Sequence, residues 1–218
     1  MALKPEKKTT VPLLAEDTYC GVCYAVIDLG KQYSEKYKKT SHKIMFIWEI
    51  TGQTVEIDGK PEPRVISREY TLTWGDKSRL KEMSDALFGS NAYTDETFEA
   101  RLVLGTPCLL SVGIDKKDDG GQYNKVTTIT KLLKGLTVHE PQELLYYEIG
   151  DASTHGVFEK IPEWIREKIK KSVDFENKVD IPANSDKVNQ KAKTETVVST
   201  TVPTVHTHSK PEDIEVPF

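Results

Sequence analysis

The pattern of apolar and polar positions predicts three strands in the first third of the chain. Within 42–51 every second residue is apolar, and these residues are Ile44, Phe46, Trp48 and Ile50. Further apolar residues stand between them, which indicates a strand buried largely on both faces. The β-rich run over 17–31 and the alternation over 64–74 predict two more strands. Turn signals over 52–63 predict a loop before the third strand.

The apolar spacing then changes to that of a helix. The helix-spaced apolar residues are Leu80, Met83 and Leu87. Asp76 is placed to cap the N-terminus of this helix, and Gly89 follows its C-terminus. A shorter helical stretch is predicted over 94–102, before a Gly-Thr-Pro sequence that breaks it.

Two further strands are predicted over 108–114 and 123–133, and the acidic, glycine-rich sequence 118–121 between them is a hairpin signal. No βαβ repeat indicates a parallel sheet. The order of three strands, one helix and two strands is that of the OB-fold, a five-stranded, partly open Greek-key barrel that binds oligonucleotides in many proteins. We therefore expect a mainly β domain built on an OB-type barrel.

An added helix and a tail follow the predicted barrel. Residues 161–172 begin with a proline in the first turn and end with lysines, as a helix does. Its apolar stripe consists of Trp164, Ile165 and Ile169, and we expect it to pack on the barrel. Residues 176–217 hold no aromatic residue and no Leu, so they bury too little apolar area to offset the entropy of ordering. Disorder is predicted there, with an edge strand over 196–202 as the alternative.

These patterns divide the chain into four parts. Residues 1–16 form an N-terminal extension, 17–175 the OB-fold domain with its added helix, 176–210 a disordered linker and 211–218 an acidic tip. No run approaches the length of a membrane-spanning helix, and the lysines near the N-terminus precede no apolar signal region. A cytoplasmic protein is therefore expected.

The charge of the chain narrows the function further. Its 34 acidic and 30 basic residues give a net charge of −4. This balance argues against a protein that coats nucleic acid through bulk positive charge. A local basic groove stays open, because association depends on where the charges lie.

Signatures of catalysis and metal binding are scarce. Cys20 and Cys23 have metal-ligand spacing, but a zinc site needs four ligands, and Cys108 with scattered histidines supplies no second pair. The acids between the last two strands are interpreted as a solvated hairpin rather than a metal loop. No P-loop, dinucleotide-binding glycine pattern, nucleophile elbow or zinc-protease helix is present. We expect no enzyme, no cofactor and no metal.

Binding chemistry is better represented, because the predicted strands interleave cations with aromatic residues. Proteins hold single strands by combining cations along the backbone path with aromatic faces that stack on bases. A basic, Tyr-containing loop over 32–41 is the strongest local cluster. Some of the aromatics must fill the core. The candidate DNA contacts are Lys31, Tyr33, Tyr37, Lys39, Lys43, Trp48, Arg64, Arg68, Tyr70, Trp74, Tyr123, Lys125 and Lys131.

The last residues carry a second kind of signal. The candidate partner-binding residues are Glu212, Asp213, Ile214, Glu215, Val216, Pro217 and Phe218. They resemble the C-terminal tip of bacterial single-stranded DNA-binding proteins, where several acids precede a hydrophobic residue, Pro and Phe. A terminal ring and carboxylate suit one pocket of a partner, and the acids suit a basic rim.

The region 19–172 resembles a phage-encoded family of single-stranded DNA-binding proteins with an OB-fold. The segments that carry the resemblance are Ala25-Val-Ile-Asp-Leu-Gly-Lys-Gln32, Lys43-Ile-Met-Phe-Ile-Trp-Glu49, Leu104-Gly-Thr-Pro-Cys-Leu-Leu110 and Ile161-Pro-Glu-Trp-Ile165. The resemblance implies binding and protection of single-stranded DNA during phage replication or recombination, without catalysis, in the host cytoplasm. It implies replication or recombination proteins as partners of the tip.

Two other readings remain open from the sequence. A protein-interaction adaptor with an OB barrel but no nucleic-acid binding is the alternative, motivated by the negative net charge. A metal-dependent nuclease is a weaker third hypothesis, which magnesium-dependent DNA cleavage would support. Barrel edges and the added helix both offer surfaces for a homo-oligomer.

Overall fold

The computed structural model describes residues 11–57, 59–141 and 143–176. Its strands are β1 (Asp17–Ser34), β2 (Lys39–Ile57), β3 (Lys60–Thr71), β4 (Pro107–Lys116), β5 (Gln122–Lys131) and β6 (Leu145–Tyr147). Its helical elements are α1 (Arg79–Phe88), the 3-10 helices η1 (Ala100–Val103) and η2 (Ala152–Lys160), α2 (Glu163–Lys170) and α3 (Val173–Glu176).

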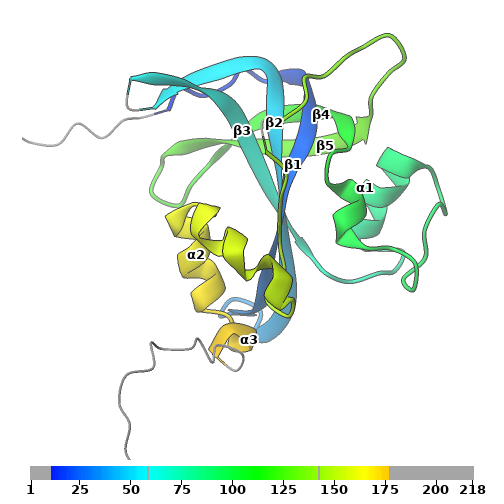
Figure 1. Cartoon of the computed structure of the whole chain (residues 1–218), viewed down its shortest axis with the longest axis vertical. Coiled ribbons are helices and arrows are strands. Elements are labelled where there is room, and N and C mark those ends of the chain that lie inside the picture. The colour runs from blue at the N-terminus through cyan, green and yellow to red at the C-terminus, as the bar shows by residue number, and fades with distance from the viewer. Residues whose placement is uncertain (1–10, 58, 142, 177–218) are drawn as a thin grey trace, which may run out of the picture. The chain divides into compact units, whose positions relative to one another are not determined.

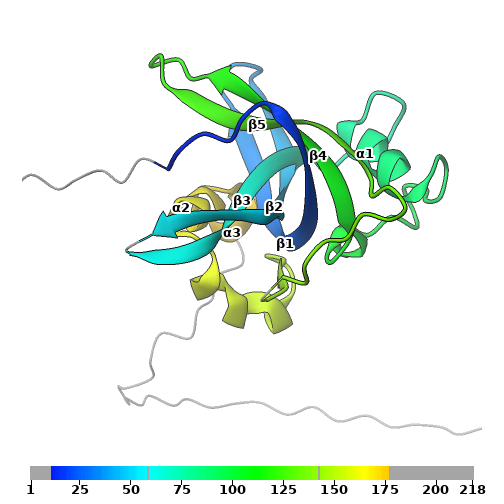
Figure 2. The ribbon, with the colours of Figure 1, turned by 90° about the horizontal axis from the view of Figure 1, so that it is seen from above.

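The fold is a mainly β, antiparallel sheet with strand order β3-β2-β1-β4-β5. The predicted strands and the helix between β3 and β4 are confirmed, and helices follow the last long strand. The short β6 adds to β1 in parallel, and no sequence pattern indicated it. Figures 1 and 2 show that the sheet is strongly curved, with α1 and α2 on opposite sides of it.

Strands β1 and β2 are buried on both faces. For β2, the apolar residues at both the alternating and the intervening positions of 42–51 predict this. Phe46 and Trp48 of β2 lie in an inner core with the apolar face of α1. Met45 and Ile47 point the other way, into an outer core. Because successive side chains of a strand point to opposite faces, one strand supplies both cores. The outer core is completed by apolar residues of β6 and α2, which are Leu145, Tyr147, Ile165 and Ile169.

The loop predicted over 52–63 is too long. A turn lies at Gly59, within the predicted range, but both strands continue through most of the rest of that range. β2 runs to Ile57 and β3 begins at Lys60, and they pair along this arm. The prolines at 61 and 63 are tolerated because β3 has a free edge, where a missing backbone N–H removes no ladder bond. The basic loop over 32–41 is likewise a hairpin end, since β1 reaches Ser34 and β2 begins at Lys39.

Two helix details also differ from the sequence prediction. The side chain that caps α1 is Ser78 rather than Asp76, and it accepts a hydrogen bond from the backbone N–H of Lys81. Gly89 ends the helix as predicted. Over 94–102 the chain forms turns and the start of η1 rather than an α-helix.

The predicted N-terminal extension is part of the fold where the structure describes it. Leu14 is buried, and its backbone N–H and C=O both hydrogen-bond the side chain of Asn124 on β5. The Glu16 carboxylate accepts a hydrogen bond from the backbone N–H of Ile114. A boundary at residue 16 therefore cuts through packed structure.

The predicted linker from 177 onward and the whole tip, 211–218, lie outside the described residues. Among the helices in the described part of the chain, none has the length and apolar character needed to cross a membrane.

Candidate nucleic-acid interface

A groove of about 560 Å³ lies between β3 and β5, the two outermost strands of the sheet order. We call it the β3–β5 groove. Its lining includes Arg64, Val65, Arg68, Tyr123, Asn124, Lys125 and Trp164. They come from three elements that are distant in sequence. Arg64, Arg68, Tyr123 and Lys125 were predicted as contacts, and the fold brings these four together.

The two arginines of β3 reach across the groove to β5. An Nη2 of Arg64 donates to the side-chain oxygen of Asn124 at 3.3 Å. Arg68 donates to the backbone oxygen of Thr127 at 3.2 Å, and its guanidinium lies 5.1 Å from the centre of the Tyr70 ring. Burial lowers the pKa of Arg64 from its ordinary value. These hydrogen bonds hold both guanidinium groups between β3 and β5 rather than extended into solvent.

On the β5 side, a lysine and a tyrosine share one acid. Lys125 forms an ion pair with Asp115 of β4 at 2.9 Å, and the Tyr123 hydroxyl lies 3.5 Å from the same carboxylate. The hydrogen bond from Lys125 lowers the pKa of Asp115, and the same bond raises the pKa of Lys125. Lys125 therefore stays charged, and Asp115 partly screens it from a ligand.

Trp164 is a groove residue that the sequence interpretation missed. It was placed in an apolar stripe with Ile165 and Ile169, but those two are fully buried while Trp164 is 57% exposed. The buried stripe recurs every four residues from Ile161, and Trp164 lies one position off it. Its place in the stripe is therefore wrong. The four-residue spacing of the isoleucines was the signal that could have separated it.

Two residues that were predicted to stack on bases are buried in the structure. Trp48 has no exposed surface and Tyr70 has 3%, and both lie in the inner core against Phe46. Their rings offer no free face to a base, so their prediction as DNA contacts is wrong for this fold. The apolar residues on both faces of 42–51 already indicated that Trp48 is covered, whereas the alternation over 64–74 did not show which of its faces is covered.

The other predicted contacts do not line the groove. Tyr33 and Tyr37 stand at the β1–β2 hairpin end, 57% and 71% exposed. The remaining ones are Lys31, which pairs with Asp174; Lys39, at the start of β2; Lys43, which donates to Thr71; Trp74, which packs on Phe98; and Lys131, exposed at the end of β5.

In the described part of the chain, no group of three or more His, Cys, Asp or Glu side chains is arranged to hold a metal ion. Cys23 and Cys108 are buried in the inner core, and burial raises the pKa of both thiols.

Neither a scan against models of protein families nor a search of curated proteins gives a match to this chain.

Proposed function

We propose that this chain binds single-stranded DNA, without catalysis, in the β3–β5 groove. The observation that carries the proposal is the convergence of Arg64, Arg68 and Lys125 with the exposed rings of Tyr123 and Trp164. Cations beside exposed aromatic faces are the combination by which proteins hold single strands without reading sequence. The cations would take backbone phosphates, and the two rings would stack on bases.

The sheet order supports an OB-type barrel as the scaffold. β1 pairs with both β2 and β4, which leaves β3 and β5 as the outermost strands. In a partly open barrel these two strands approach each other. Hydrogen bonds from Arg64 and Arg68 to β5 join them here. In this proposal the groove is the seam of the barrel, where side chains rather than a backbone ladder connect the strands.

The β1–β2 hairpin end supplies a second contact in this proposal. OB-folds bind oligonucleotides with the loop between their first two strands as well as with the strands themselves. Tyr33 and Tyr37 are exposed there, and Lys36 lies 5.5 Å from the Tyr37 ring centre. The phage replication or recombination role, and recruitment of partner proteins by residues 211–218, are proposed from the sequence resemblance alone.

Fluorescence anisotropy of a labelled dT oligonucleotide against the full chain tests the proposal. Trp164→Ala should weaken binding about fivefold or more, because stacking on an aromatic ring contributes roughly 1–3 kcal/mol per base. Lys125→Ala should weaken it and flatten its dependence on salt, because one phosphate contact is lost. Lys77→Ala, which removes an exposed cation before α1, is the matched control.

Equal affinity for the wild type and for Trp164→Ala, Lys125→Ala and Lys77→Ala would place the DNA elsewhere. Absence of any oligonucleotide binding would overturn the proposal and favour the protein-interaction adaptor. A chain without 211–218 should bind the oligonucleotide at least as tightly as the full chain, because that segment carries acids rather than cations. Loss of binding on that truncation would contradict the assignment of DNA to the groove.

A further inference from the structure

One face of α2 continues from the β3–β5 groove along the surface of the molecule. Trp164, Lys168 and Lys171 recur at spacings of four and three residues, which places them on the same side of the helix. We call it the α2 face. Ile165 and Ile169 are fully buried in the outer core, so the helix is anchored by a different side. The α2 face is therefore held in place beside the groove.

Contacts of Lys168 show where the α2 face leads. Its ammonium group pairs with Glu69 of β3, a residue that lines the groove. Its backbone oxygen accepts a hydrogen bond from the side chain of Gln32 at 2.9 Å. Gln32 lies near the end of β1, just before the β1–β2 hairpin end. The helix thus runs from the groove to the base of that hairpin (Figure 1).

The cations along this route differ in how they are engaged. Lys168 pairs with Glu69, and Lys31 of β1 pairs with Asp174 of α3 at 3.2 Å. Both pairs are partly exposed to solvent, and such pairs are weak enough for a phosphate to compete with the acid. Lys171 is exposed and forms no ion pair with another described residue. It is therefore free to contact an anion.

We propose that a single DNA strand runs along the α2 face, from the β3–β5 groove to the β1–β2 hairpin end. This inference rests on the proposed function, which gives the two contacts but no path between them. Lys168 and Lys171 contact the phosphates that follow the base stacked on Trp164, and Lys31 contacts the phosphates before the hairpin tyrosines. A row of cations between exposed rings suits a single strand, whose phosphates and unstacked bases are both available.

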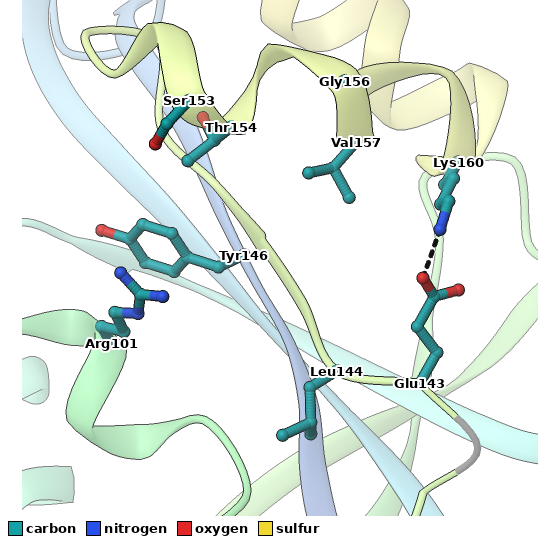
Figure 3. A pocket seen from close by; sticks show the side chains of 9 residues that line it. All are labelled: Arg101, Glu143, Leu144, Tyr146, Ser153, Thr154, Gly156, Val157 and Lys160. Atoms are coloured by element: carbon teal, nitrogen blue, oxygen red, sulfur yellow. Dashed lines mark hydrogen bonds and ion pairs between the residues drawn. The ribbon is translucent and has the colours of Figure 1, made fainter.

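The opposite direction from the groove, along η2, leads to a second cavity of about 390 Å³. It is lined by residues of η1 and η2, among them Arg101 and Lys160, and Lys160 pairs there with Glu143 (Figure 3). The Tyr146 ring packs on the inner core and has the Arg101 guanidinium 4.9 Å from its centre. This ring has no free face for a base, so the cavity lacks the stacking partner that the hairpin end provides.

Fluorescence anisotropy with labelled dT oligonucleotides of two lengths tests the path. One of about four nucleotides matches the lower limit of OB-fold site sizes, and one of about twenty exceeds the upper limit. Lys171→Ala should weaken binding of the long oligonucleotide about fivefold at low salt and reduce the salt slope by about 0.7, because one phosphate contact is lost. Binding of the short oligonucleotide, held by the groove alone, should not change.

Lys170→Ala is the matched control for Lys171→Ala. Lys170 has the same charge and lies on the same helix, but it points to another side and pairs with Glu167 at 2.9 Å. It should leave both affinities unchanged. Equal effects of the two substitutions on the long oligonucleotide, in chains whose circular dichroism matches the wild type, would overturn the inference.

Two further variants locate the far end of the path. Tyr37→Ala should weaken binding of the long oligonucleotide only, and over a series of lengths the effect of Lys171→Ala should appear before that of Tyr37→Ala. Arg101→Ala should change neither affinity. A loss of affinity for the long oligonucleotide in Arg101→Ala but not in Lys171→Ala would place the DNA strand on the η2 side and overturn the inference.

Trp164→Ala separates this inference from the proposed function. If binding of the short oligonucleotide depends on Trp164 while the long one is insensitive to Lys171→Ala, the groove stands and the path is refuted. If Lys171→Ala weakens binding but Trp164→Ala and Lys125→Ala do not, the α2 face stands as a DNA contact and the groove is refuted. Absence of binding at both lengths would overturn both.

Discussion

The Arg64 side chain of β3 donates a hydrogen bond to the side chain of Asn124 on β5, so one amide joins the two outermost strands of the sheet order. The same amide accepts from the backbone N–H of Leu14 at 2.8 Å and donates to its carbonyl oxygen at 2.9 Å. Asn124 therefore ties together three segments that are distant in sequence.

Asn124→Ala should lower the free energy of unfolding by about 2–3 kcal/mol, because three hydrogen bonds of roughly 1 kcal/mol each are lost. Urea unfolding monitored by circular dichroism measures it. Thr128→Ala, at an exposed position of the same strand, should change stability by less than about 0.5 kcal/mol. Similar losses in the two variants would show that the amide does not hold the seam.

Asp115→Asn should tighten binding of a dT oligonucleotide and steepen its dependence on salt. The substitution frees Lys125, whose 2.9 Å ion pair with Asp115 competes with a phosphate. The pair is exposed, and such pairs contribute little to stability, so the melting temperature should hardly move. Anisotropy titrations at two salt concentrations check this. Unchanged affinity and salt slope would mean that Lys125 makes no phosphate contact.

Gly30→Ala should be strongly destabilising. Gly30 has a φ of +66°, and an added Cβ would lie 2.6 Å from Ser172 Oγ and 2.7 Å from Ile149 Cδ1. Gly120→Ala is the control, because Gly120 has a φ of +83° but nothing within 4 Å of an added Cβ. We expect about 1 kcal/mol for the control and more than about 3 kcal/mol for Gly30→Ala, measured by chemical unfolding. Equal losses of unfolding free energy in the two variants would show that the segment around Ser172 moves aside at no cost.

His42 should make stability depend on pH. Its hydrogen bond to Asp28 raises its pKa above the ordinary 6.5, although burial opposes this, and the Asp174 charge adds to the rise while Lys31 opposes it. A raised pKa means that the folded state binds the proton more tightly than the unfolded state. The resulting stabilisation is complete below pH 6.5 and is lost as the pH rises through the folded-state value.

Comparing the wild type with His42→Gln across that range by urea unfolding checks this pH dependence. The wild type should hold its largest advantage at acidic pH and lose part of it toward alkaline pH. An advantage that grows with pH would contradict the assigned pair.

Tyr70→Phe should leave stability unchanged or raise it slightly, and should leave oligonucleotide affinity unchanged. The Tyr70 hydroxyl is buried without a hydrogen-bond partner among the described residues, and burial raises its pKa to about 12. Removing an unsatisfied buried hydroxyl removes a desolvation penalty. Thermal unfolding and anisotropy measure the two effects. A loss of oligonucleotide affinity would restore Tyr70 as a contact.

The order of elements could be predicted from sequence because it depends on local periodicity. The run of apolar residues around Phe46 and Met45, at both alternating and intervening positions, predicted a strand with two buried faces. The structure has one core on each side of it. The spacing of Leu80, Met83 and Leu87 predicted α1. Turn chemistry was less decisive, because 52–63 has loop-like residues but pairs as an edge arm in which the prolines are tolerated.

What the sequence determined by itself was therefore which residues share a face of a strand or helix, because backbone geometry fixes those periods. Outside 42–51, only the tertiary structure decided which faces are covered. It buried Tyr70, exposed Trp164, and brought Arg64 and Arg68 to Tyr123 and Lys125 from strands about sixty residues apart. Such meetings depend on the curvature of the sheet and on packing between distant segments, which no local pattern encodes.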